Sequence, residues 1–271
     1  PIYLFKIGYA ITSILFFYFL ISLSFVAFSY LGAKVVSKIG IKHSILWSTP
    51  FLIAYFLGLK FLPNYPWLFF ILPFLSSFRM ILYNYGYHLN YVTHSDKKKR
   101  GREISFMGSM VLVMYIIAPL IGGIIASKSF GLLYLVGSGL LVIGTFPLFL
   151  TKDNREKFKF TEKAIFRRIF TKKRRGELIS YAGYSVEFVI GLVLWPIFLI
   201  MILLTVEKTG LIVTLSMLLS LVAFYFIGKL TDKFNKIKLL KFGAILYALG
   251  WIFRIFAKSQ LKILIIDSYK N

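Results

Sequence analysis

The feature that most constrains this chain is a succession of long apolar spans joined by short polar loops. A hydrocarbon layer about 30 Å thick is crossed by a helix of about 20 apolar residues, and these spans have that length. They also lack the alternation of apolar and polar residues that barrel strands show. The sequence therefore predicts an all-α polytopic membrane protein with eight full spans and the start of a ninth at Leu261. The eight spans are predicted at Ile7–Leu31, Ile45–Leu62, Trp67–Tyr91, Ile104–Ala126, Leu132–Leu150, Leu178–Val206, Leu211–Ile227 and Leu239–Ala257.

The positive charge of the chain is distributed unevenly among the loops. Hydrophobic residues make up 58% of the sequence, which excludes an ordinary water-soluble fold, and the formal net charge is +23. Lys and Arg number 24 in the loops on one side of the predicted spans and five in the loops on the other side. Cytoplasmic loops carry such an excess of basic residues. We therefore expect an integral protein of the plasma (inner) membrane with Pro1 outside, and no nucleic-acid binding.

A basic segment divides the predicted spans into two groups. Residues 152–175 contain eleven Lys or Arg and three Asp or Glu, and no apolar run long enough to cross a bilayer. We therefore predict an N-terminal half-bundle over residues 1–151, a cytoplasmic linker over 152–177 and a C-terminal half-bundle over 178–271. Within the linker, apolar and basic residues fall on different faces at helical spacing, which indicates a short amphipathic helix that is either a lipid sensor or a solvated tether. The apolar residues are Ile165, Phe166, Ile169 and Phe170, and the basic ones are Lys163, Arg167, Arg168, Lys172 and Lys173.

One loop signature appears twice, after the first and after the seventh span. The two copies stand 195 residues apart, which implies an internal repeat. Each copy combines a small residue at the start with basic residues that follow, as a tight hairpin on the inner face requires. The fifth position of the second copy is an acid that can accept hydrogen bonds from the first amides of the next helix, whereas the first copy has a serine there. The conformational loop residues are predicted to be Ser37, Lys38 and Gly40 in the first copy and Gly228, Asp232 and Lys233 in the second.

This pair of loops resembles the major facilitator superfamily, in which a Gly-x-Leu-Ala-Asp-Arg-x-Gly-Arg-Arg loop joins helices two and three and a weaker copy joins helices eight and nine. The fourth span also contains Ala118-Pro119-Leu-Ile-Gly122-Gly123, which resembles the Gly-Pro-x-x-Gly-Gly of helix five in exporters of that family. Pro119, Gly122 and Gly123 are therefore the expected helix-packing motif. The resemblance implies that residues 1–151 hold the family's helices two to six, and that residues 178–271 hold helices seven to nine and the start of ten. We then expect a fragment that lacks helix one and the last helices.

Charged residues inside the predicted spans need a reason, because each costs about 2.5 to 3.5 kcal/mol on insertion scales. The four that stand out are Arg79, Glu187, Arg254 and Asp267. Arg254 lies near the outer end of its span, and we interpret it as a structural residue that snorkels to the interface. The residues on the same helix face as Arg79 are Tyr83, Gly86, Tyr87 and Asn90, and those on the face of Glu187 are Ser180, Tyr184, Gly191 and Trp195.

The resemblance places these charged faces on helices four, seven and ten, which line the central cavity in that family. We hypothesise that Arg79 holds an anionic group of the solute or a protein carboxylate. Glu187 or Asp267 is then expected to exchange a proton during transport. The alternative for all three charges is a buried ion pair between helices.

The function that this pattern favours is secondary active transport of a small solute by alternating access, coupled to protons, with export and antiport preferred. A polytopic membrane enzyme acting on a lipid-linked substrate and a non-transporting scaffold with the same fold are the alternatives. The sequence has no cysteine, and neither His43 nor His94 has a partner at metal-binding spacing, so no metal site is expected. Nucleotide-binding motifs are not found either. We expect no cofactor, and a monomer whose partners are the lipid bilayer, the solute and protons.

Overall fold

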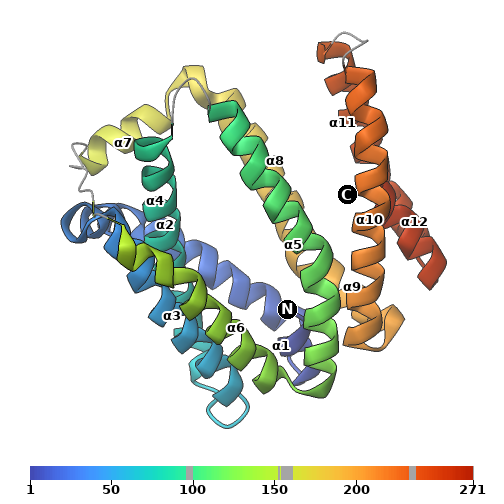
Figure 1. Ribbon diagram of the computed structural model, residues 1–271, viewed down its shortest axis with the longest axis horizontal. Coiled ribbons are helices and arrows are strands. Elements are labelled where there is room, and N and C mark those ends of the chain that lie inside the picture. The colour runs from blue at the N-terminus through green and yellow to red at the C-terminus, as the bar shows by residue number, and fades with distance from the viewer. Residues whose placement is uncertain (96–99, 152, 154–160, 232–235, 271) are drawn as a thin grey trace. The chain divides into compact units, whose positions relative to one another are not determined.

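The computed structural model describes the whole chain except residues 96–99, 152, 154–160, 232–235 and 271. Within these described residues every regular element is a helix, in agreement with the predicted class (Figure 1). The elements are α1 (Ile2–Lys6), α2 (Ile11–Ile39), α3 (Ile41–Phe61), α4 (Leu68–His94), α5 (Arg100–Lys128), α6 (Phe130–Thr145), η1 (Phe146–Leu150), α7 (Glu162–Ile169), η2 (Lys172–Arg174), α8 (Arg175–Val189), η3 (Ile190–Leu194), α9 (Trp195–Leu203), α10 (Val206–Thr231), α11 (Lys236–Phe253), η4 (Arg254–Phe256) and α12 (Gln260–Lys270). The stretch η3 is π-helical, and the other η elements are 3₁₀ helices.

The helices group into two compact units. The first unit contains residues 1–99 and 130–197, and the second contains residues 100–129 and 198–271. This grouping places α5, which the sequence analysis assigned to the first half-bundle, with α10 and α12. The division into half-bundles at the basic segment therefore stays a prediction.

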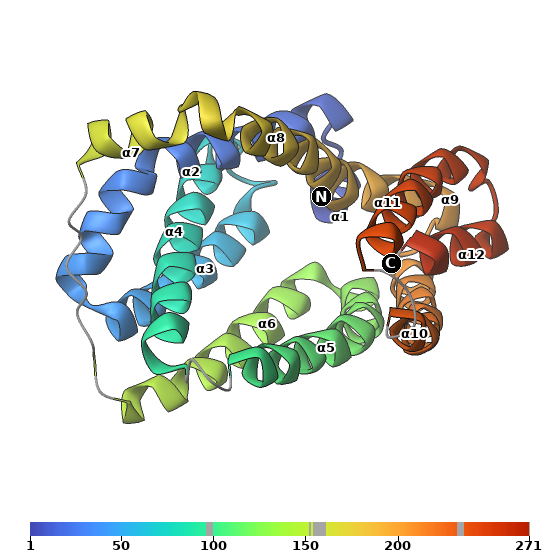
Figure 2. The same ribbon diagram turned by 90° about the horizontal axis from the view of Figure 1, so that it is seen from above.

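The first unit is built around α2, α3 and α4, with α6 packed on α3 (Figures 1 and 2). Its core includes aliphatic and aromatic side chains of α2, α3 and α4, together with Leu4 of α1, Val193 of η3 and Ile197 of α9. A buried hydroxyl also joins two of the helices, because Ser77 of α4 donates to the carbonyl oxygen of Ile21 in α2 at 2.6 Å. Such a bond satisfies a polar group that hydrocarbon could not satisfy.

The second unit depends on the close approach of α5 and α10, which lie side by side in Figures 1 and 2. Gly123 of α5 faces Gly210 of α10, and a methyl group on Gly210 would meet the carbonyl oxygen of Pro119. Because no side chain separates the two backbones, Thr214 reaches across and donates to the carbonyl oxygen of Ile116 at 2.6 Å. Two residues of the predicted packing motif, Pro119 and Gly123, thus lie at a helix contact.

The third residue of that motif, Gly122, is half-buried.

A second contact of α10 is with α12, and hydroxyl groups form hydrogen bonds across it. Ser220 donates to the carbonyl oxygen of Ser268 at 2.9 Å, and Ser216 donates to that of Leu264 at 3.5 Å. Small and hydroxylated residues therefore form both contacts of α10, as is usual where lipid supplies no hydrophobic drive for association.

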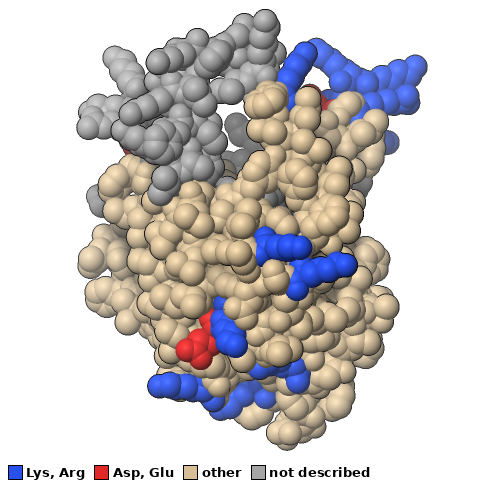
Figure 3. All heavy atoms as spheres, turned by 90° about the vertical axis from the view of Figure 1, so that its right-hand side faces the viewer, with Lys and Arg blue, Asp and Glu red and all other residues tan. Residues whose placement is uncertain are grey.

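The outer surfaces of the helices are suited to lipid. Many large apolar side chains are exposed on them, and most of the described face in Figure 3 carries no charge. An exposed apolar surface of this extent is stable where hydrocarbon covers it.

The helices α10 and α11 overlap the seventh and eighth predicted spans in sequence. That the chain crosses the membrane eight times stays a prediction. In the described part of the chain, six helical runs are long and apolar enough to cross a membrane, namely Ile11–Ile39, Ile41–Phe61, Leu68–Thr93, Phe106–Lys128, Phe130–Leu150 and Lys172–Leu203.

The first helices differ from the predicted bounds at two points. Gly8 adopts a φ of 96° and interrupts the chain between α1 and α2, so the first long helix begins at Ile11 rather than Ile7. The same helix then continues past Leu31 to Ile39. Its last turn carries Lys38, and a cation there interacts favourably with the negative end of the helix dipole.

We predict that Gly210→Val destabilises the protein by about 1 to 3 kcal/mol, because the added side chain overpacks a backbone contact. Thermal unfolding in detergent should show a lower midpoint. Gly108→Val in α5 is the matched control, since an added Cβ there meets no atom within 4 Å. An equal loss of stability in the two variants would contradict the backbone contact.

Candidate functional site

The polar face predicted on α4 is present as a row of aromatic rings beside Arg79. The guanidinium carbon of Arg79 lies 5.4 Å from the ring centroid of Tyr83, and Tyr83 stacks on Tyr87 with centroids 5.8 Å apart. Residues four apart share a helix face, and a cation is attracted to an aromatic face by the ring quadrupole. Asn90 is half-buried near the end of the same helix. Arg79 is thus positioned by its own helix.

The helix α3 packs against part of this face. Gly86, which the helical wheel places on the polar face, is instead buried against α3, where a methyl group would meet the hydroxyl of Ser44. The polar face is therefore narrower than the sequence predicts. Neither of the two ion pairs formed by the described residues involves Arg79.

The predicted acidic site lies in the run formed by α8, η3 and α9. Glu187 is half-buried on α8, three residues before η3, and Trp195 is half-buried at the start of α9. Pro196 has no amide to donate to the carbonyl four residues earlier, and the wider π-helical turn accommodates its ring. Tyr184 is 62% exposed, with its ring centroid 6.2 Å from that of Phe188. The proline thus places an irregular turn directly after the glutamate.

The structure does not bring Arg79 and Glu187 together. Both belong to the first unit, but no ion pair joins them among the described residues, and α8 makes no extensive contact with α4 in the described part of the chain. The interhelical ion pair that the sequence analysis kept as an alternative is therefore not formed by these two residues. They are separate polar positions on two helices.

Asp267 forms a buried ion pair within the second unit. Its carboxylate oxygen lies 3.0 Å from a guanidinium nitrogen of Arg254, and the two side chains are 3% and 7% exposed. The guanidinium carbon also lies 4.2 Å from the ring centroid of Trp251. The expectation that Arg254 snorkels to the interface is wrong, because α12 packs on α11 and η4 and supplies a carboxylate inside the protein. Asp267 thus forms a buried ion pair, which was the alternative to proton exchange for this residue.

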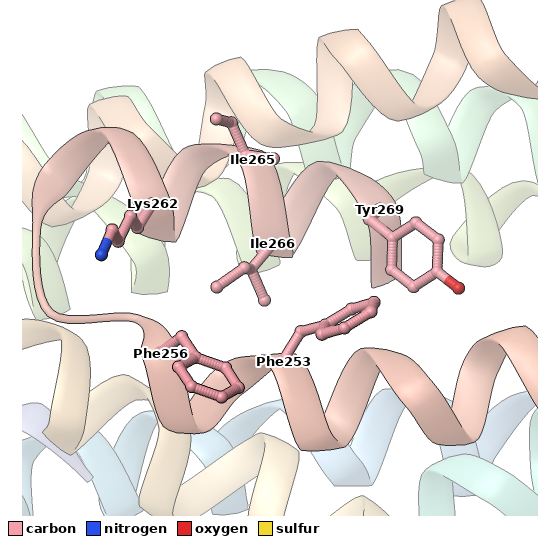
Figure 4. A pocket seen from close by; sticks show the side chains of 6 residues that line it. All are labelled: Phe253, Phe256, Lys262, Ile265, Ile266 and Tyr269. Carbon is pink, nitrogen blue, oxygen red and sulfur yellow. The ribbon is translucent and has the colours of Figure 1, made fainter.

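An apolar pocket of about 330 Å³ lies between the end of α11, η4 and α12 (Figure 4). Phe253 and Phe256 form one wall, and Ile266 points toward them from α12. Lys262 lies at one end and Tyr269 at the other, where its hydroxyl donates to the carbonyl oxygen of Leu246 at 2.8 Å. This pocket contains none of the predicted site residues.

The first loop signature lies mostly within helices, and the connection between them is a single residue. Ser37 and Lys38 belong to the last turns of α2, and Gly40 alone separates α2 from α3. Gly40 has a φ of 96°, a conformation that residues with a side chain rarely adopt, and a methyl group there would meet the carboxylate of Asp153. The tight turn therefore depends on glycine for both its backbone and its packing.

Asp153 is a functional candidate that the sequence analysis missed. Its carboxylate accepts a hydrogen bond from the backbone amide of Lys42 at 2.8 Å and lies 2.9 Å from Nδ1 of His43, both in the first turn of α3. The ammonium group of Lys42 donates to the carbonyl oxygen of Thr151 at 2.9 Å. An acid from the basic segment thus binds a backbone amide in the first turn of the helix that follows the loop signature, as a capping side chain does. No spacing rule links two residues 111 apart.

The second loop signature lies at the edge of the described chain. Gly228 falls near the end of α10, and its surroundings are not described, while Asp232 and Lys233 lie outside the described residues. In the described part of the sequence, no three His, Cys, Asp or Glu residues are grouped closely enough to hold a metal ion.

Comparison with known protein families assigns the chain to a family. The sequence model described as Major Facilitator Superfamily matches residues 89–266, which is more than half of the chain. The chain belongs to the major facilitator superfamily. No individual curated protein matches it. As a member of this superfamily, it is an integral membrane protein of a transporter family whose environment is the lipid bilayer.

The superfamily match covers only part of the predicted site. It includes Asn90, Glu187 and the packing motif on α5, whereas Arg79 precedes it and Asp267 follows it by one residue. The family match therefore gives no support for a role of Arg79 or Asp267, and their proposed roles rest on the contacts that they make in the structure.

For the buried ion pair, we predict that Arg254→Gln or Asp267→Asn alone costs about 3 to 5 kcal/mol, because each leaves a buried charge without its partner. The double variant Arg254→Met, Asp267→Leu should recover most of this loss. Thermal unfolding in detergent measures the three variants, with Lys262→Gln on α12 as the control. Single variants as stable as the unaltered protein would mean that the two charges are hydrated.

At the α2–α3 turn, we predict that Asp153→Ala weakens the start of α3. Loss of a capping side chain costs about 1 kcal/mol, so hydrogen exchange at the first amides of α3 should accelerate about fivefold. Lys42→Gln is the control because it keeps the backbone amide that Asp153 binds. Unchanged exchange in Asp153→Ala would show that this contact does not stabilise the helix.

Proposed function

We propose that this superfamily member is a secondary active transporter that moves a small solute by alternating access. The solute is proposed to bind beside Arg79, at the rings of Tyr83 and Tyr87. The observation that carries this assignment is an arginine that lies beside the aromatic ring of Tyr83 and, among the described residues, has no ion-pair partner. A charge in a membrane helix is costly, so an unneutralised guanidinium favours an anionic group on the solute.

Protons are the proposed coupling ion, with Glu187 or Asp267 as the group that exchanges them. Glu187 is half-buried beside a π-helical turn, a type of irregularity that is frequent at functional sites. Asp267 binds Arg254, and a proton on this carboxylate would weaken that ion pair and change the contact between α12 and η4. Either carboxylate would link protonation to a change in helix packing.

The proposed moving parts are the half-bundles 1–151 and 178–271. Both are proposed to lie in the plasma membrane and to be joined by a cytoplasmic linker. The contact between α5 and α10 supports this proposal, because these helices come from different half-bundles and meet through glycine backbones. A surface without interlocking side chains allows one helix to shift along the other. Export and antiport are preferred, since Pro119, Gly122 and Gly123 match the exporter motif in all but its first residue.

The test of alternating access uses single cysteines, because the sequence has no cysteine of its own. Tyr83→Cys and Tyr184→Cys are each exposed to an impermeant maleimide from either side of the membrane. If a proton gradient drives alternate opening, reversing the pH gradient should move the labelling of each position from one side to the other. Leu135→Cys on α6 is the control, since this exposed apolar position should remain unlabelled.

Two results would contradict the proposal. If Tyr83→Cys and Tyr184→Cys stay unlabelled from both sides, these faces do not open to water, and the protein is a scaffold of the same fold. If labelling occurs from one side under every gradient, the cavity does not alternate.

A further inference from the structure

The amphipathic helix α7 and the basic residues that follow it have no role in solute transport as proposed above. α7 separates apolar and basic residues more strongly than any other described helix. No other described element packs extensively on it, and it lies at the periphery of the first unit in Figures 1 and 2. An amphipathic helix that no described element covers extensively has an apolar side suited to another surface.

At the end of α7, exposed apolar side chains and exposed basic side chains lie next to each other. Phe170 is 68% exposed and Ile169 is 36% exposed, directly beside exposed cations. The side chains of Ile165, Phe166 and Arg168 lie outside the description. The exposed cations around these apolar residues are Lys163, Arg167, Lys172, Lys173 and Arg175.

The chain connections hold α7 at the membrane surface. The segment leaves one membrane-crossing run at Leu150 and enters the next at Lys172, so both of its ends lie at the same interface. Near its start, Asp153 is bound to the first turn of α3, which is the end of a third membrane-crossing run. The helix therefore cannot move far from the lipid headgroups.

We propose that α7 and the adjoining residues through Arg175 form a binding surface for anionic lipid headgroups of the cytoplasmic leaflet. In this surface Phe170 and Ile169 insert below the headgroups, and the neighbouring Lys and Arg side chains contact the lipid phosphates. Eleven Lys or Arg against three Asp or Glu in residues 152–175 match an anionic leaflet. A membrane is favoured over a protein or nucleic acid, because its headgroups are adjacent and its acyl chains accept the exposed phenylalanine.

The test uses the whole chain in vesicles of phosphatidylcholine alone or of an equal mixture with phosphatidylglycerol. A nitroxide label on Phe170→Cys reports its accessibility to a water-soluble nickel chelate and to oxygen. In the mixture, accessibility to the chelate should fall several-fold and accessibility to oxygen should rise. High salt should reverse the change, because it screens the headgroup charges.

Charge variants in the same labelled background test the role of the cations. Removing one cation near an anionic surface weakens attraction by about fivefold, so Lys163→Gln, Arg167→Gln and Lys172→Gln together should abolish the difference between the two lipids. The matched control neutralises Lys60, Lys128 and Lys208, which lie in the opposite set of loops, and should keep the difference. All these side chains are exposed, so thermal unfolding should be unchanged.

Two outcomes would overturn the proposal. A label that remains accessible to the nickel chelate in both lipids means that α7 is a solvated tether. A label that is protected equally in both lipids and in detergent means that protein covers Phe170, from the same chain or from a second copy. Neither outcome depends on transport, so the surface is tested independently of the proposed function.

Discussion

The structure depends on the inability of hydrocarbon to satisfy polar groups. Each backbone amide and carbonyl within a membrane span must find a partner inside the protein, and a helix meets this requirement locally. The same constraint governs the hydroxyl groups between helices. Ser77 and Thr214 each donate to a carbonyl oxygen of a neighbouring helix, at 2.6 Å in both cases. Helix contacts in this protein are therefore made by small and hydroxylated residues as well as by aliphatic packing.

Charged side chains meet the same constraint in two different ways. Arg254 is neutralised by Asp267 and covered by Trp251, so its charge is contained within the second unit. Arg79 lies beside the ring of Tyr83, which attracts a cation without neutralising it. This difference is the basis for proposing that Arg79, and not Arg254, faces an anionic solute. Arg254 instead holds Asp267, the carboxylate proposed as one of two that could exchange a proton.

At the turn between α2 and α3, the basic segment has a structural role that its charge does not indicate. Its acid Asp153 binds the first turn of α3, beside the glycine turn that ends α2. The first loop signature has serine where the family has an acid, and the carboxylate of Asp153 binds the backbone amide of Lys42 in the next helix. The segment is thereby connected to the helix ends of the first unit.

Properties of single helices were predictable from the sequence. The apolar spans predicted α3, α4 and α5 to within a few residues, because hydrophobic length and helix formation are local. The row formed by Arg79, Tyr83 and Tyr87 was predictable for the same reason, since residues four apart share a face on any helix. Pro119 and Gly123 were recognised as packing residues, but their partner Gly210 was not.

Pairs between helices were decided by the tertiary structure alone. Arg254 and Asp267 meet because the chain turns between η4 and α12, and hydropathy had indicated that Arg254 reaches the interface. Asp153 meets His43 across 110 residues, and no local pattern anticipates that distance. The sequence by itself determined which segments are helical and which residues each helix presents on one face, because both follow from the local backbone. Only the docking of one helix on another decided which faces meet, and with them the partners of the buried charges.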